Sequence, residues 1–112
     1  ALIVSNHGGR QLDGAPSSIS ALPGIVEAAG RDIEVWMDGG VRSGQDVLKA
    51  RALGARGTLI GRAFLYGLGA AGEAGVTRAL QIIHKELDVS MAFCGRTRID
   101  DVGSDILLPG SF

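Results

Sequence analysis

Three short apolar runs mark the first 61 residues of the chain, and glycines or charged residues follow each of them. The runs are ALIVS at 1–5, IEVWMD at 33–38 and GTLIG at 57–61. Strict alternation of apolar and polar positions is absent, which is typical of parallel strands that are covered on both faces. The pattern therefore predicts three buried, parallel strands.

Apolar residues at helical spacing lie between and after these runs. They predict one helix over 17–30, capped by one of its two leading serines, and a second over 43–54. In the second helix Ser43 and Asp46 fit a capping box. A longer helix is predicted over 73–93. Its apolar stripe consists of Val76, Leu80, Ile83, Leu87 and Met91.

The resulting order of elements is strand, helix, strand, helix, strand, helix, helix, with no internal repeat and no linker. This alternation indicates a parallel α/β architecture, and a chain of 112 residues is long enough for one domain only. Three such strands fit a small open sheet, and they equally fit the last three strands of an eight-stranded barrel. The pattern of positions leaves both arrangements open.

Composition and charge narrow the classes of partner. With 11 Lys and Arg against 12 Asp and Glu the formal net charge is −1, so the basic surface typical of nucleic-acid binding is missing. No apolar run approaches the roughly 20 residues of a membrane-spanning helix. The one cysteine, Cys94, belongs to no zinc motif, and we predict no metal site. We expect a cytoplasmic or membrane-peripheral setting in a bacterium.

Glycine is unusually frequent, at 18 of 112 residues or about 16%, against roughly 7% on average. The most informative glycines directly follow the predicted strands, as HGGR at 7–10, DGGVR at 38–42 and GR at 61–62. Glycines at such places indicate tight turns or backbone that closely approaches a ligand. Because the carboxyl ends of parallel strands meet at one edge of a sheet, we predict a ligand site at that edge.

The second and third of these segments predict a phosphate site. Gly39 and Gly40 allow backbone N–H groups to approach an anion, and Arg42 and Arg62 supply forked cations. The helix that starts after Ser43 is expected to add the positive end of its dipole. The competing interpretation is that the glycines form plain turns and the arginines are solvated. Two such segments on adjacent strands favour the phosphate site.

His7 and Arg10 predict the chemistry at the end of the first strand. A neutral imidazole can remove a proton near neutral pH, and an arginine can hold a carboxylate through two parallel hydrogen bonds. Together they indicate a site for a small organic acid that reacts next to its carboxylate; the alternative is a structural histidine. Asp13 is either a partner of His7 or a turn former. His84, in a charged stretch of the long helix, receives no role.

These motifs together resemble the C-terminal part of the FMN-dependent α-hydroxy acid oxidases and dehydrogenases, which include glycolate oxidase, L-lactate dehydrogenase and oxidase, and mandelate dehydrogenase. The segments SNHGGRQLDG, DGGVRSGQDVLKARALGA and IGRAFLYGLGAAGEAGV match the family's pattern in order and spacing. The first segment is highly specific, whereas the other two are shared more widely among FMN-binding barrels. The resemblance implies a TIM (β/α)8 barrel, with the three predicted strands as its sixth, seventh and eighth, and FMN as the cofactor.

The resemblance also implies a role for each site residue. His7 corresponds to the active-site base, and Arg10 corresponds to the ligand of the substrate carboxylate. Ser5 resembles the strand-end residue that contacts the flavin. The residues that resemble the site of the ribityl phosphate are Asp38, Gly39, Gly40, Val41, Arg42, Gly61 and Arg62.

The implied reaction oxidises an (S)-2-hydroxy acid to a 2-oxo acid and reduces FMN, with oxygen, a quinone or a cytochrome as the electron acceptor. The family also implies a homo-oligomer, a tetramer. One alternative is another FMN-barrel enzyme, an isopentenyl-diphosphate isomerase or an IMP-dehydrogenase-like protein, which would share only the DGGVRSG phosphate site. A second alternative is a non-catalytic module that binds phosphate or another subunit.

Family members are longer than this chain, and several of their site residues lie in the part that it does not match. These include the tyrosines that bind substrate, a lysine near the flavin, and the aspartate that orients the catalytic histidine. We therefore expect residues 1–112 to be the C-terminal part of a single barrel domain whose N-terminal part is another chain. Alone, the chain is expected neither to fold stably nor to turn over, because sheet edges and apolar faces would be uncovered.

Overall fold

The fold is built on a parallel sheet of three short strands, seen in a computed structural model that describes residues 1–111. The strands are β1 (Leu2–Val4), β2 (Val35–Met37) and β3 (Gly57–Thr58), and they lie side by side in chain order. Each is shorter than the apolar run that predicted it and lies within that run. The prediction of three parallel strands is therefore confirmed, but the prediction that they are covered on both faces is wrong for the described residues, because Ile3 is exposed and β3 is only partly buried.

Helices follow each strand, as predicted. Helix α1 (Ser18–Ala29) starts after Ser17, whose side chain accepts the hydrogen bond of the backbone N–H of Ser20. Helix α2 (Gly44–Ala52) begins with the predicted capping box between Ser43 and Asp46. Because these caps satisfy backbone donors that a helix start would otherwise leave unpaired, they fix where each helix begins.

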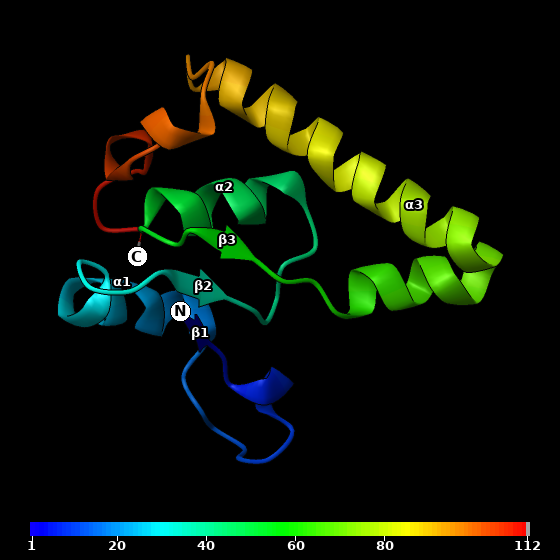
Figure 1. The fold of residues 1–112 in the computed structure, drawn as a ribbon, viewed down its shortest axis with the longest axis horizontal. Helices are drawn as coiled ribbons and strands as arrows, with labels where there is room; N and C mark the ends of the chain where they lie inside the picture. The colour runs from blue at the N-terminus through cyan, green and yellow to red at the C-terminus, as the bar shows by residue number, and fades with distance from the viewer. Residues whose placement is uncertain (112) are drawn as a thin grey trace.

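Helix α3 (Arg62–Phe93) is a helical hairpin, since Ala71 and Gly72 in its middle leave the helical conformation. The hairpin extends away from the sheet, and its second arm then runs back past α2 (Figure 1). The two arms touch at Gly67 and Gly75, where a β-carbon on either glycine would collide with the backbone of the other. No helix of the described residues is long and apolar enough to span a bilayer.

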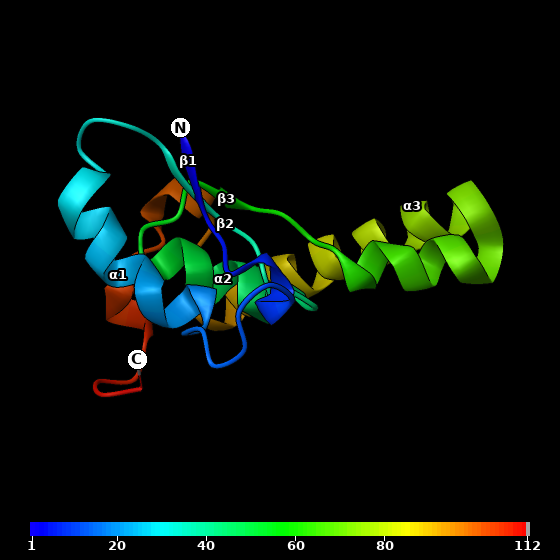
Figure 2. The same cartoon turned by 90° about the horizontal axis from the view of Figure 1, so that it is seen from below.

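The helices cover one face of the sheet only. Val4, Val35 and Met37 point toward α1 and α2 and form the core with Leu22 and Ala50, all of them buried. Figure 2 shows the sheet on one side of these helices. On its other face Ile3 is 52% exposed, Leu59 is 40% exposed and Trp36 is half-buried. Helices thus cover one face of the sheet, and the other apolar face is exposed.

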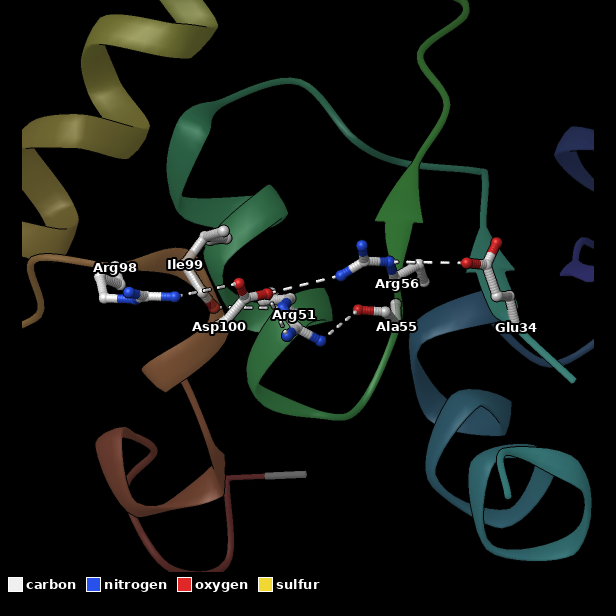
Figure 3. A network of polar contacts seen from close by, with 7 residues as sticks. All are labelled: Glu34, Arg51, Ala55, Arg56, Arg98, Ile99 and Asp100. Carbon is white, nitrogen blue, oxygen red and sulfur yellow. Dashed lines mark hydrogen bonds and ion pairs between the residues drawn. The ribbon is translucent and has the colours of Figure 1, made fainter. Parts of the chain in front are cut away.

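Ion pairs and buried side chains hold the segment after Gly95 against the rest of the fold. Asp100 lies between Arg51 at the end of α2 and Arg56 beside β3, with N–O distances of 3.4 Å to each (Figure 3). Arg56 also pairs with Glu34, which directly precedes β2, at 3.6 Å. Val102 is buried in a second small core under α2. The tail therefore closes the amino-terminal edge of the sheet, opposite the edge with the predicted site.

Candidate functional site

The predicted site residues gather around one cleft at the carboxyl ends of the three strands. The cleft has a volume of about 710 Å³, and the segments after β1, β2 and β3 all contribute to its wall. The predicted residues that line it are His7, Arg10, Asp38, Gly39, Gly40, Val41, Arg42, Gly61 and Arg62. Ser5 does not line the cleft; its hydroxyl accepts the hydrogen bond of the backbone N–H of His7 at 3.0 Å.

The loop after β1 forms a tight turn that presents His7. His7, Gly8 and Gly9 have φ angles of +54°, +67° and +69°, all in the left-handed region. Asn6 caps this turn, with its Oδ1 atom accepting the hydrogen bond of Gly8 N–H at 3.0 Å. No side chain among residues 1–111 hydrogen-bonds to the His7 imidazole, which is exposed and able to meet a ligand.

The sequence left two roles open for Asp13, a partner of His7 or a turn former, and the structure supports the turn former. Its Oδ1 atom accepts a hydrogen bond from the backbone N–H of Gly14 at 3.0 Å. Gly14 has a φ of +76°, as expected of a glycine in a turn. Asp13 therefore shapes the loop, and within the described structure it makes no hydrogen bond or ion pair with His7.

The loop after β2 needs both of its glycines. Gly39 and Gly40 have φ angles of +85° and +78°, which residues with a β-carbon rarely adopt. A β-carbon on Gly39 would also lie 3.0 Å from the hydroxyl of Ser18, whereas one on Gly40 would meet nothing within 4 Å. Gly39 is thus packed against the start of α1, and Gly40 leaves open space beside the cleft.

The start of α2 is already occupied by carboxylates. Asp46 Oδ2 accepts from the backbone N–H groups of Arg42 and Ser43 at 3.0 and 2.9 Å, and Glu86 Oε2 accepts from Gly44 N–H at 2.9 Å. These bonds use the donors that a phosphate would need and place two negative charges there. The prediction that α2 offers its positive end to an anion is therefore wrong.

In contrast to α2, the start of α3 has no side-chain cap. Its N-cap residue is Gly61, which supplies no side-chain hydrogen bond, and a β-carbon there would meet nothing within 4 Å. Within residues 1–111 no carboxylate lies within 4 Å of the side-chain nitrogens of Arg10, Arg42 or Arg62. Three forked cations and an uncapped helix start therefore meet at the cleft, which suits an anionic ligand with more than one charged group.

Two buried polar atoms at the cleft lack partners. Ser18 Oγ and Asp38 Oδ1 are inaccessible to water and have no hydrogen-bond partner in the described structure. Buried polar groups are nearly always paired, so these two atoms are exceptions among the residues that line the cleft. Ser18 and Lys49, which also lines the cleft, were missed from the sequence. Lys49 follows Asp46 by three residues, a spacing that puts both on one face of α2 and could have been noticed.

Comparison with known families matches residues 1–109 to the family described as FMN-dependent dehydrogenase. Pre-mycofactocin synthase of Mycolicibacterium smegmatis is 52% identical over 113 residues, which cover 100% of this chain and 28% of that protein. L-lactate dehydrogenase of Caulobacter vibrioides is 56% identical over 106 residues, covering 95% of this chain and 28% of the relative.

Solved structures agree with these relatives. An oxidised active mutant of (S)-mandelate dehydrogenase superposes with a TM-score of 0.88 at 44% identity, over 93% of this chain and 29% of that one. The structural neighbours are TIM-barrel flavoenzymes, so the predicted fold class, a part of a (β/α)8 barrel, is confirmed. The chain spans about 28% of the length of the curated relatives named above.

Proposed function

Because the chain belongs to the FMN-dependent dehydrogenase family, we propose that it supplies the substrate-binding and phosphate-binding parts of a flavoenzyme that oxidises a 2-hydroxy acid to a 2-oxo acid. One observation carries this proposal: His7 and Arg10 line the same cleft as Arg42 and Arg62. A base and a carboxylate ligand thus lie beside a phosphate site, as an organic acid and a flavin nucleotide together require.

The residues of the cleft fit FMN. Arg42, Arg62 and the uncapped start of α3 would hold the phosphate, and the open space beside Gly40 admits it. Asp38 lines the cleft and suits a hydroxyl of the ribityl chain, because an ionised carboxylate can only accept hydrogen bonds. FMN, when bound, supplies the acceptor for the two electrons that leave the substrate.

His7 and Arg10 act on the substrate in this proposal. Arg10 binds the carboxylate and so orients the carbon next to it, and His7 takes a proton from the substrate as this carbon is oxidised. Both side chains are exposed at the cleft wall, where a substrate can reach them. Ser5 contributes indirectly, since its hydroxyl holds the backbone of His7.

We propose further that the active unit contains this chain together with the other strands of the barrel, and we call this unit the assembled flavoprotein. The apolar sheet face with Ile3 and Leu59 exposed supports the proposal, because such a face is normally covered. Residues 1–112 would then form the C-terminal part of one barrel domain. Homo-oligomer formation, and reoxidation by oxygen, a quinone or a cytochrome, belong to the same proposal.

The test is to add a small (S)-2-hydroxy acid to the assembled flavoprotein without oxygen and to follow the visible absorbance of the flavin. The proposal predicts a yellow protein that bleaches, and a His7→Gln variant that stays yellow and bleaches at least about 100-fold more slowly. A colourless protein would contradict the proposal and favour a non-catalytic phosphate-binding module.

A second candidate is a flavoenzyme that acts on a different substrate, and the match of Pre-mycofactocin synthase to the whole chain favours it. In that case the protein would be yellow, but a panel of 2-hydroxy acids from lactate to mandelate would leave the flavin oxidised. Bleaching by any of these acids decides against this candidate.

A further inference from the structure

The backbone of the His7 turn is held in a conformation that its sequence does not favour. His7 has a φ of +54°, and a residue with a β-carbon rarely adopts this region unless the surroundings impose it. Gly8 and Gly9 continue in the same region. The direction in which the imidazole points therefore depends on whatever holds this turn.

Asn6 makes two side-chain hydrogen bonds, one within the His7 turn and one to the far end of the loop that follows it. Its Oδ1 atom accepts from Gly8 N–H at 3.0 Å, and its Nδ2 atom donates to the carbonyl of Pro16 at 3.2 Å. The first bond fixes the turn that carries His7. The second ties together the two ends of the loop 7–16, which carries Arg10. An amide suits this place because it offers an acceptor and a donor on one short side chain.

Asn6 also lies against the second loop of the site. A β-carbon on Gly39 would be 3.4 Å from Asn6 Oδ1, so the side chain fills the space between the His7 turn and the Gly39 turn. Asn6 is half-buried and lines the cleft, in keeping with this central place.

We propose that Asn6 is a positioning residue that sets the imidazole of His7 and, separately, holds together the ends of the loop that carries Arg10. The inference rests on the proposed function, and it assigns the two tasks to different atoms. The bond from Gly8 N–H to Oδ1 sets the rate of substrate oxidation through His7. The bond from Nδ2 to Pro16 sets substrate affinity through Arg10.

Two variants of the assembled flavoprotein separate these tasks. Asn6→Ala removes both bonds. Asn6→Asp keeps an acceptor for Gly8 N–H but sets an oxygen against the carbonyl of Pro16 and adds a negative charge. A matched control is Ser20→Ala, which removes an exposed hydroxyl that accepts from the Ser17 hydroxyl and donates to the Ser17 carbonyl, and that makes no hydrogen bond to residues 6–10.

Three measurements are made on each variant: the limiting rate of anaerobic flavin reduction, the substrate dissociation constant, and the rate of trypsin cleavage after Arg10. Asn6→Ala should reduce the flavin about 10- to 100-fold more slowly, the loss expected when a catalytic group is misplaced by about 1 Å. Asn6→Asp should stay within about threefold of the wild-type rate but bind substrate about tenfold more weakly, as one lost hydrogen bond predicts.

Trypsin should cleave both Asn6 variants faster than the wild type and the Ser20→Ala variant, because the bond from Asn6 to Pro16 no longer joins the two ends of the loop 7–16. The inference would be overturned if Asn6→Ala reduced the flavin and was cleaved by trypsin at the wild-type rates. It would also be overturned if Asn6→Ala and Asn6→Asp slowed flavin reduction equally. Failure of the wild type itself to reduce flavin with any 2-hydroxy acid would instead overturn the proposed function. The cleavage rates still test the closing of the loop by Asn6 in that event.

Discussion

At the scale of single residues, backbone conformation marks the site as clearly as side-chain chemistry does. Within residues 1–111, His7 is the one non-glycine residue with a positive φ. This conformation costs a residue with a β-carbon about 1–2 kcal/mol, and such local strain clusters at functional sites. The sequence predicted that His7 faces a cleft, but it could not predict the left-handed turn, because hydrogen bonds that Ser5 Oγ and Asn6 Oδ1 accept from the backbone N–H groups impose it.

Gly39 should tolerate a side chain less well than Gly40. Alanine at either position meets an unfavourable φ, but only at Gly39 does the new β-carbon also press on Ser18 Oγ. We expect Gly39→Ala to lower the free energy of unfolding by about 1–2 kcal/mol more than Gly40→Ala does. Urea unfolding of the assembled flavoprotein measures the difference. The double variant Gly39→Ala/Ser18→Ala should recover most of it, and a double variant as unstable as the single one would contradict this reading of the contact.

Arg42 should distinguish FMN from riboflavin, which lacks the phosphate. A charge-assisted hydrogen bond contributes about 1.5–3 kcal/mol, so Arg42→Gln should weaken FMN binding about 10- to 100-fold and riboflavin binding by no more than about twofold. Quenching of flavin fluorescence by the assembled, flavin-free protein gives both affinities. Arg31→Gln, at the opposite end of the strands, is the control. Equal losses for the two flavins in Arg42→Gln would place the phosphate elsewhere.

At the scale of elements, the start of α2 is fixed by a contact with the second arm of α3. Gly44 is buried there, its N–H bonds to Glu86, and a β-carbon on it would collide with the backbone at Ile83, Glu86 and Leu87. The capping box of α2 was predictable because its two residues are three apart. The contact with α3 was not, because its partners lie about 40 residues further along the chain.

Gly44→Ala should destabilise the fold, whereas Gly24→Ala should not. At Gly44 the β-carbon meets backbone that cannot move without shifting α3, and overpacking of this kind typically costs about 1–3 kcal/mol. Gly24 lies in the middle of α1 with nothing within 4 Å of an added β-carbon, so alanine there should stabilise the helix by about 0.5–1 kcal/mol. Thermal unfolding of both variants checks the opposite signs, and a Gly44→Ala protein of wild-type stability would show that α3 packs differently.

At the scale of the whole molecule, the two edges of the sheet have different tasks. The carboxyl edge carries the cleft, and the amino edge is closed by the tail through Asp100, Arg51 and Arg56 (Figure 3). The ion pairs of Asp100 could not be predicted from the sequence, because its two partners are 44 and 49 residues away. Alternating strands and helices predicted the α/β class, but only the motifs, through their resemblance, separated a barrel segment from a small open sheet.

In the proposed flavoenzyme one cleft, formed by the ends of β1, β2 and β3, binds both the phosphate of FMN and the carboxylate of an organic acid. A crystal structure of the assembled flavoprotein with FMN and a 2-oxo acid tests it most directly. We expect the phosphate to contact Arg42 and Arg62, and the carboxylate to pair with Arg10 beside His7. A phosphate bound outside this cleft, or a carboxylate that does not touch Arg10, would contradict it.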